Sequence, residues 1–243
     1  MKIFALSEGA FTIDKSKIFV PFDIRNDKLN DRPIGSLLVE IQPFLIITTK
    51  DIIILDTGLG FSDENGQLQI HKNCKAVGVS PESVTKVLLS HLHKDHASGI
   101  KNIIGDLSFK NAIYYINKNE LEFALNNESL SYVKDPLSDI SKLPNVTLTD
   151  DVGIIDGYIF HEVTGGHSKF HQSFKIIENN ETIFFGGDVA PQLQQMKSRF
   201  VAKYDLDGKK SMELRKLWMD QGKNENWTFL FYHDIKNPIF TFN

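Results

Sequence analysis

Ser90-His91-Leu92-His93-Lys94-Asp95-His96 comes directly after the apolar run Val87-Leu88-Leu89 and places three imidazoles and one carboxylate within six residues. Imidazole nitrogen together with carboxylate oxygen is a ligand set for Zn²⁺ and, to a lesser extent, for Fe or Mn, whereas Ca²⁺ and Mg²⁺ require mostly oxygen. Side chains alternate along an extended segment, so we expect His91, His93 and Asp95 on one side. A helix that begins after Asp95 would bring His96 beside them, and the segment could then serve two metal ions.

The composition is that of an ordinary globular protein. The 243 residues are 41% hydrophobic and 24% charged, and we expect them to form one domain, residues 1–243. The net charge of −4 argues against a nucleic-acid partner. Cys74 is the only cysteine, so no internal disulfide calls for an oxidising compartment. With no signal-peptide core and no run of about twenty apolar residues, we expect a cytoplasmic protein without a membrane segment.

Strands are expected where short apolar runs end at glycine, proline or turn residues. A β segment over residues 1–13 precedes a polar, irregular stretch over residues 14–35. The run Ile52-Ile53-Ile54-Leu55 is apolar throughout, which predicts a strand covered on both faces. The predicted strands after residue 35 are 36–41, 44–48, 52–55, 86–89, 113–116, 146–148, 153–155, 158–163, 182–185 and 227–231.

Four helices are expected from caps and apolar spacing. Ser80-Pro81-Glu82 is typical of a helix start, and Asn117 with Glu120 resembles a capping box. Helical spacing also joins Ala97, Ile100, Ile103 and Ile104 up to Gly105, and Leu214, Leu217 and Trp218 up to Gly222. Residues 126–145 are polar and show neither pattern.

One event recurs along the chain: an apolar strand ends in a glycine or a tight turn and then in His or Asp. It occurs at Asp56, His91, His167, Asp188 and His233. Strand ends are where an open α/β sheet places its functional site. Asp-Thr-Gly at Asp56 is also the catalytic tripeptide of aspartic proteases, but they need a second copy, and none is present. We therefore interpret Asp56 as a residue that orients a metal ligand.

In this order the elements resemble the metallo-β-lactamase superfamily over nearly the whole chain. The signature His-x-His-x-Asp-His is His91 to His96, and the early Asp-Thr-Gly is Asp56 to Gly58. The histidine in a glycine-rich turn is His167, the acid after Phe-Gly-Gly is Asp188, and the last histidine is His233. The resemblance implies an α/β fold, a four-layer αβ/βα sandwich of two mixed β-sheets with helices on the outer faces and the site along one edge.

The resemblance also implies a dinuclear metal site with two Zn²⁺, or Fe or Mn in their place, and a metal-bridging hydroxide as the attacking group. Asp95 is in addition the expected catalytic acid-base residue. Asp56 and His171 are expected to support the ligands from behind. The ligands implied are His91, His93 and His167 for the first metal, Asp95, His96 and His233 for the second, and Asp188 between them.

The pattern is most similar to the lactonase and phosphotriesterase-like branch, which implies hydrolysis of a small ester, lactone or organophosphate. A glyoxalase II-like thioester hydrolase is the alternative, but those members carry a C-terminal helical domain, and only ten residues follow His233. True β-lactamases usually lack the acid at Asp188, flavodiiron proteins replace the second histidine, and the nucleases need an added RNA-binding element. A catalytically inactive metal-binding relic is the non-enzymatic reading, although relics lose ligands and all seven positions are filled here.

Two departures from the family pattern bear on the substrate. The turn reads Gly166-His167-Ser168-Lys169-Phe170-His171 where members commonly have Gly-His-Thr-Pro-Gly-His, so the place of Lys169 is open. Lactonase-like members commonly put a Tyr just after the bridging acid to hold the substrate carbonyl. The nearest here is Tyr204, which reaches the site only if residues 192–206 fold back over it. An aromatic content of 11% would permit an apolar pocket or a homodimer surface.

Overall fold

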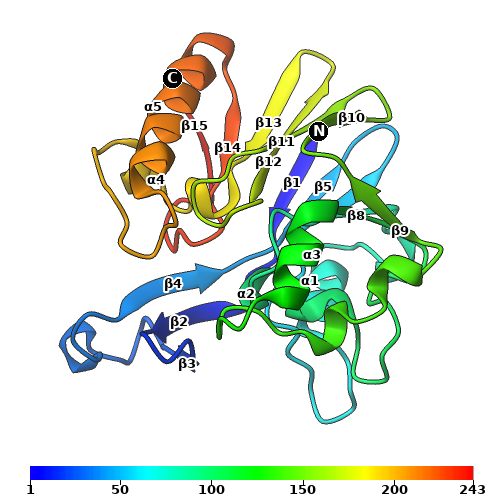
Figure 1. Ribbon diagram of the computed structural model, residues 1–243, viewed down its shortest axis with the longest axis horizontal. Helices are drawn as coiled ribbons and strands as arrows, with labels where there is room; N and C mark the ends of the chain where they lie inside the picture. The colour runs from blue at the N-terminus through cyan, green and yellow to red at the C-terminus, as the bar shows by residue number, and fades with distance from the viewer. Residues whose placement is uncertain (243) are drawn as a thin grey trace.

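Two six-stranded sheets pack face to face in the computed structural model, which describes residues 1–242 (Figure 1). The first sheet begins with antiparallel strands and continues with parallel ones, whereas the second is antiparallel except where β13 meets β14. In spatial order the first sheet is β1 (Lys2–Ala5), β5 (Phe44–Ile47), β6 (Ile52–Leu55), β7 (Lys86–Leu88), β8 (Ile113–Asn117) and β9 (Val146–Thr149). The second is β10 (Val152–Ile155), β11 (Ile159–Val163), β12 (Gln172–Glu178), β13 (Glu181–Phe185), β14 (Thr228–Leu230) and β15 (Ile239–Thr241).

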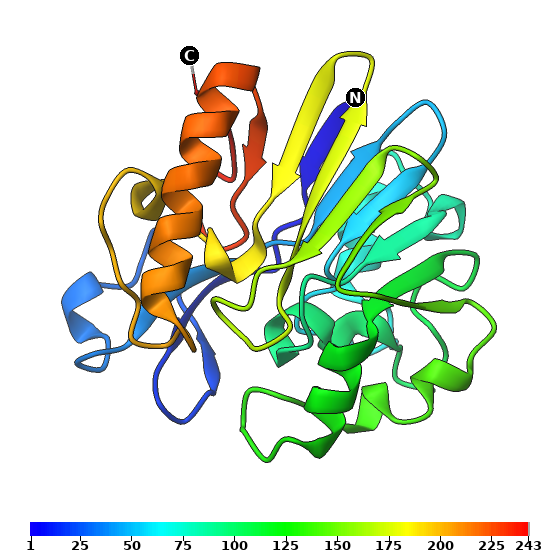
Figure 2. The ribbon, with the colours of Figure 1, turned by 45° about the horizontal axis from the view of Figure 1, so that its top comes forward.

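Helices cover the outer face of each sheet, as the turned view makes plain (Figure 2). Helix α5 (Gly208–Glu225) covers the second sheet, and helix α3 (Lys118–Asn126) covers the first. The shorter helices are α1 (Gln69–Ala76), α2 (Lys94–Ala97) and α4 (Leu193–Met196), with 3-10 turns η1 (Leu29–Asp31), η2 (Pro81–Ser83), η3 (Ser98–Ile100), η4 (Asp135–Leu137), η5 (Ile140–Lys142) and η6 (Gly187–Val189). No helix among residues 1–242 has the length and apolar character needed to cross a membrane.

Three separate apolar cores hold the layers together. Ile53 and Leu55 face the second sheet, where they join Phe174 and Phe185, whereas Ile54 faces the helices outside the first sheet. A third core fills the space between the second sheet and α5. The apolar run in β6 is therefore buried on both faces, as expected of a strand inside a layered fold. The predicted four-layer sandwich is confirmed.

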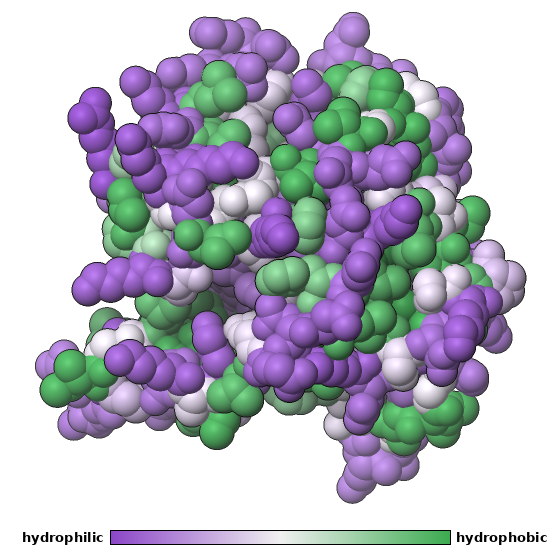
Figure 3. All heavy atoms as spheres, viewed as in Figure 1, coloured by the Kyte–Doolittle hydropathy of each residue, from purple (hydrophilic) through white to green (hydrophobic). Residues whose placement is uncertain are grey.

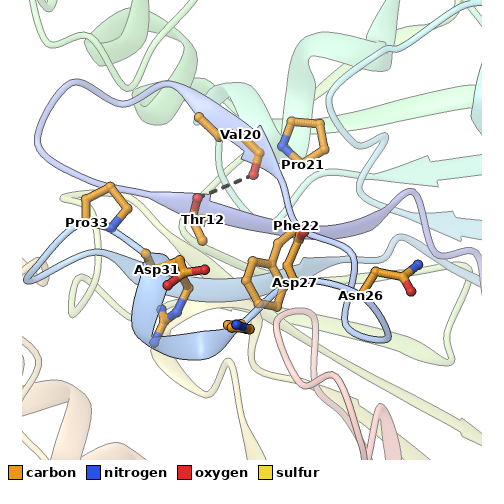
Figure 4. A pocket seen from close by; sticks show the side chains of 10 residues that line it. Thr12, Val20, Pro21, Phe22, Asn26, Asp27, Asp31 and Pro33 are labelled. Carbon is orange, nitrogen blue, oxygen red and sulfur yellow. Dashed lines mark hydrogen bonds between the residues drawn. The ribbon is translucent and has the colours of Figure 1, made fainter.

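A three-stranded antiparallel sheet projects from one side of the sandwich and is called the arm below (Figure 1). It consists of β3 (Phe19–Pro21), β2 (Gly9–Ile13) and β4 (Leu37–Ile41). The sequence predicted its two long strands, but β3 falls in the stretch expected to be irregular. Thr12, Val20 and Phe22 line a small pocket inside the arm, of about 290 Å³, with Asp27 and Asp31 at its edge (Figure 4).

Two predicted helices are wrong. The expected helix up to Gly105 ends after α2 and η3, and Ile103 and Ile104 are 68% and 77% exposed. The backbone leaves the helix at Lys101, which is extended and pairs with Leu107, and the Asn102 side chain accepts from Ile104 N in the turn between them. Ser80 does not cap a helix either, since its hydroxyl bonds the Glu82 carboxylate and only the turn η2 forms.

Two further expectations need correction. Strand β12 was not predicted, because Ser173, Lys175 and Glu178 interrupt its apolar residues and it starts directly after His171. Helix α5 runs past Gly222 to a left-handed residue at Asn226. Gly222 is needed inside the helix because a Cβ there would lie 2.3 Å from the Phe229 ring. Leu217 is half exposed, and Arg215 with Trp218 forms the buried face instead.

A buried ion pair joins the two sheets at the end opposite the histidine cluster. Lys86 Nζ lies 2.5 Å from Asp51 of the first sheet and 2.9 Å from Asp156 in the β10–β11 turn. Tyr158 donates its hydroxyl to the same Asp51 carboxylate. Lys86 and Asp51 are both buried. Removing one member of such a pair leaves the other charge buried without a partner.

Lys86→Met should therefore lower the free energy of unfolding by about 3 kcal/mol. The matched control is Lys110→Met, an exposed lysine, for which we expect a change within about 0.5 kcal/mol. Urea unfolding followed by circular dichroism measures both. Equal stabilities of the two variants would contradict the role given to the pair.

Candidate metal centre

Five separate loops meet at one edge of the sandwich, each at the end of a strand. Asp56 follows β6, the His91 to His96 segment follows β7, and His167 lies between β11 and β12. Asp188 lies in η6 after β13, and His233 follows β14. Because parallel neighbours β6 and β7, and likewise β13 and β14, end at the same edge, the sequence pattern of strand, turn and ligand becomes one site.

Seven side chains present ligand atoms in three overlapping groups, and within each group these atoms lie within 4.8 Å of one another. Asp188 belongs to one group and also reaches a histidine of each of the other two. Its Oδ1 is 3.0 Å from His233 Nε2 and 3.1 Å from His96 Nε2, and its Oδ2 is 3.2 Å from His167 Nε2. The groups are His91 with His93 and His167, His91 with His96 and Asp188, and Asp95 with His96 and His233.

Hydrogen bonds within the protein cannot satisfy these atoms. His93 Nδ1 lies 3.0 Å from both His91 Nε2 and His167 Nε2, and a single proton can serve only one of these contacts. Buried polar atoms are normally paired, yet His96 Nε2 and Asp188 Oδ1 have no hydrogen-bond partner within residues 1–242. Convergent imidazole nitrogens and carboxylate oxygens are the donor set of Zn²⁺ and related cations, so the residues fit a metal cofactor.

Hydrogen bonds to Nδ1 fix the orientation of four of the histidine rings. The Nδ1–H of His96 donates to Asp56 at 2.7 Å, that of His167 to Asp205 at 2.9 Å, and that of His233 to the Glu40 carbonyl at 2.7 Å. His91 Nδ1 donates to the Ser90 hydroxyl at 3.1 Å in the same way. Each ring therefore turns its Nε2 towards the cluster, which is how a metal-binding histidine is usually oriented. His93 differs, because its Nδ1 faces the cluster.

Asp56, predicted as a supporting residue, is fully buried beneath the ligand segment. Its carboxylate accepts from the backbone N–H of Ser90 and from the Ser90 hydroxyl, both at 2.7 Å, besides His96. Its backbone adopts a left-handed conformation, with φ 58°, that aims the carboxylate back under β7. Burial raises the pKa of Asp56, although these bonds oppose the shift.

His171 supports Asp188 and not another histidine. Its Nε2 accepts from the Asp188 backbone N–H at 3.1 Å while its Nδ1 bonds the Thr164 hydroxyl at 2.8 Å. Burial lowers the pKa of His171 to about 3, which keeps the ring neutral for this role. Gly187 leaves room for the contact, since a Cβ there would lie 2.5 Å from His171 Nε2.

The two halves of the cluster differ in electrostatics. Burial lowers the pKa of His91 and His93, and the neighbouring histidines lower it further. Burial opposes charge at His96 and His233 as well, but the carboxylates of Asp188 and Asp95 outweigh it and raise the pKa of both. One half thus offers neutral imidazoles, and the other has an excess of negative charge that attracts a cation.

One geometric expectation needs correction. Helix α2 begins at Lys94 and not after Asp95, so Asp95 lies in the first helical turn and does not share a face with His91 and His93. It instead lies with His96 and His233 in one group of ligand atoms. Tyr232 holds this turn, because its hydroxyl donates to the Asp95 carbonyl at 2.6 Å and its ring stacks on His96 with centroids 4.1 Å apart.

Glu120 is a supporting residue that the sequence analysis did not identify. Asn117 caps α3 by accepting from the Glu120 N–H, as predicted, but the Glu120 side chain does not return to the cap. It is buried and accepts from Leu92 N at 3.0 Å, from the Tyr132 hydroxyl at 3.3 Å and from the Ser168 hydroxyl at 3.5 Å. One carboxylate therefore ties together the loops that carry His91, His93 and His167.

The cluster lies at the base of a cavity of about 940 Å³. The arm forms one wall, α3 with the loop up to Tyr132 forms another, and the segment 200–206 forms a third. That segment folds back because Leu206 N donates to the His167 carbonyl at 3.0 Å and Asp207 N to that of Gly166 at 2.8 Å. Tyr204 and Lys169, whose positions were open, both line the cavity.

Fold and cluster together define a metalloprotein of the four-layer αβ/βα type. The family model of the metallo-beta-lactamase superfamily matches residues 40–229. The chain belongs to this superfamily, as the sequence resemblance indicated.

The relatives lie in the hydrolase branches. N-acyl homoserine lactonase AiiA from Bacillus thuringiensis subsp. kurstaki is 26% identical over 223 residues, covering 83% of this chain and 84% of that protein. A probable metal-dependent hydrolase from Staphylococcus aureus has the same fold, with a TM-score of 0.82 at 23% identity over 99% of this chain and 91% of that one. The dizinc quorum-quenching lactonase AidC, solved with a product, gives a TM-score of 0.74 at 22% identity over 98% and 88%. The similarity to AiiA supports a lactonase-like hydrolase, and the two solved structures support the fold.

Glu120→Gln should weaken zinc binding by about tenfold, because the amide turns an N–H group towards donors that need an acceptor. The same mismatch should lower the free energy of unfolding by about 2 kcal/mol. Glu122→Gln, an exposed position on the same helix, is the control and should change neither. Competition with a chromogenic chelator measures the affinity. Unchanged zinc affinity in Glu120→Gln would show that this carboxylate does not position the ligand loops.

Proposed function

We propose that this chain is a dinuclear zinc hydrolase that cleaves a small ester, lactone or organophosphate. The observation that carries the proposal is the position of Asp188, whose two oxygens face His167 on one side and His96 with His233 on the other. A carboxylate so placed suits a bridge between two cations. The similarity to homoserine lactonases supports the hydrolytic branch. The cytoplasmic location, the single domain and the homodimer surface expected from the sequence stay predictions.

We assign His91, His93 and His167 to one metal, and Asp95, His96 and His233 to the other. When bound, the metals supply Lewis acidity: they lower the pKa of a coordinated water and polarise the substrate oxygen. Asp95 is the proposed acid-base residue, because it lines the cavity and its carboxylate faces His96 and His233 at 3.7 and 3.5 Å. Tyr232 and α2 fix its backbone, so that carboxylate can take up and return a proton at one place.

Tyr204 takes the part of the tyrosine missing after Asp188. Its hydroxyl accepts from Gln195 Nε2 at 3.0 Å, which leaves its own proton free to donate, and its ring lies 6.0 Å from that of His167. Burial raises the pKa of Tyr204 to about 12, so the phenol stays protonated at neutral pH. A neutral donor at this wall of the cavity suits an oxygen that gains negative charge during acyl transfer.

The proposal predicts about two metal ions per chain in protein purified without chelator, measured by mass spectrometry of the metals. Removing them should lower kcat/KM at least about 100-fold on a panel of lactones, aryl esters and phosphotriesters, and added Zn²⁺ should restore it. Asp188→Asn should reduce both metal content and turnover, whereas Asp220→Asn, exposed on α5, should change neither. Turnover that survives chelation, with less than one metal per chain, would overturn the proposal.

Tyr204→Phe should lower kcat by about 100-fold at unchanged metal content, since one donor to the developing negative charge is lost. The matched control is Tyr115→Phe, because Tyr115 is buried away from the cavity and its hydroxyl makes no hydrogen bond within residues 1–242. Steady-state kinetics on the best panel substrate compares the two. A loss confined to KM would assign Tyr204 to ground-state binding instead.

A further inference from the structure

Five lysines line the cavity above the metal-binding cluster, in a protein whose net charge is −4. None of their ammonium groups forms an ion pair or a hydrogen bond with another side chain in residues 1–242. Hydrophilic side chains border the hollow between the arm and the sandwich (Figure 3). The five are Lys15, Lys17, Lys94, Lys169 and Lys203.

Carboxylates of the cavity do not balance these lysines. Asp95 and Asp188 belong to the metal-binding cluster, and Asp205 is bonded to His167. Asp14 is exposed and accepts from the N–H and hydroxyl of Ser16 within its own turn. Apart from the cluster, the cavity therefore has an excess of positive charge that attracts anions.

Two of the lysines differ from the other three in burial and in place. Lys17 and Lys94 are half-buried, whereas Lys15, Lys169 and Lys203 are exposed. Lys94 lies between His93 and Asp95, so its backbone is fixed at the cluster itself, and its Nζ lies 6.0 Å from the centre of the Phe19 ring. Lys17 precedes Phe19 by two residues in the β2–β3 turn and adopts a left-handed backbone, with φ 57°. Both lysines therefore line the cavity where the β2–β3 turn meets the ligand segment.

Two half-buried cations that form no ion pair attract a ligand that provides negative charge. The same wall is otherwise apolar, with Phe19, Leu37 and Val39 of the arm lining the cavity. A ligand that fits it has an apolar body, a cleavable acyl group at the metals and a negative charge at the arm. Neutral homoserine lactones or triesters leave both lysines unpaired.

We propose that the substrate carries an anionic group, separate from the bond that is cleaved, and that Lys17 and Lys94 bind it. This inference rests on the proposed function, because it names the substrate class of the same site. The arm thus contributes specificity, while the loops at the strand ends contribute the chemistry. Charge attraction also raises the rate of encounter and makes it depend on salt.

Matched acyl compounds test the inference. Mono-4-nitrophenyl glutarate and 4-nitrophenyl valerate share a leaving group and chain length but differ in a terminal carboxylate. We expect kcat/KM to be at least about tenfold higher for the glutarate at low salt, with the advantage shrinking as ionic strength rises. The double variant Lys17→Gln/Lys94→Gln should lose most of this ratio, whereas Lys216→Gln, exposed on α5, should retain it. A ratio near one, or a ratio that the double variant leaves unchanged, would overturn the inference.

Binding of the products gives a second measurement that does not depend on turnover. Calorimetry should show glutarate binding at least about tenfold more tightly than valerate, and 4-phosphonobutyrate in a third arm shows whether a carboxylate or a phosphoryl anion is preferred. Equal affinities for glutarate and valerate would mean that carboxylates bind only at the metals, against the inference. If no panel substrate is hydrolysed yet glutarate is still preferred, the proposed function fails and the anion subsite stands.

Discussion

Seven side chains direct acceptor atoms into one buried region, where there are too few N–H groups for all of them to form hydrogen bonds. His93 Nδ1 is 3.0 Å from two other imidazole nitrogens, and Asp188 Oδ1 is buried without a hydrogen bond. Such an arrangement is unfavourable in itself, because each unpaired buried polar atom costs about 1–3 kcal/mol. It persists only when a cation supplies the missing interactions, or when the surrounding structure holds the ligands in place. The hydrogen bonds and apolar cores around the cluster hold these ligands in place.

That holding comes from a second layer of bonds, each tied to a strand end. Asp56 accepts hydrogen bonds from Ser90 and His96 beneath β7, and His171 accepts one from the backbone of Asp188. Glu120 joins the loop of His91 and His93 to the loop of His167. Backbones in left-handed conformations at Asp56 and Gly187 let these side chains turn back towards the cluster. Strained or special backbone positions of this kind persist where packing over-determines them. Cores on both sides of β6 provide that packing.

The convergence of the His and Asp side chains followed from the sequence more directly than the walls of the cavity did. Ligand types, their order and the strand ends were readable because apolar runs and His or Asp after a turn leave a local pattern. Strand β12 was not readable because polar residues interrupt its apolar pattern, and the helix end was not readable because it depends on the pairing of Lys101 with Leu107. Glu120 had a local signal, the helix cap, that concealed its tertiary role. The fold-back of Tyr204 depends on backbone bonds to residues 166 and 167, which no spacing rule encodes.

The metal-binding cluster and the cavity walls differ in how they are stabilised. The turn of the arm that bears Lys17 is followed by exposed apolar side chains at Ile18 and Val20, whereas Phe11, Val39 and Ile41 of the arm join the core between the two sheets. Residues of that turn can therefore change without loosening the cluster, whereas β4 of the arm holds His233 through the Glu40 carbonyl. Lys94 is a second link between arm and cluster, since its backbone belongs to the ligand segment and its side chain reaches the arm at Phe19. A residue shared by both regions couples the charge that the arm recognises to the position of the ligands, so the choice of substrate cannot be wholly separate from the chemistry.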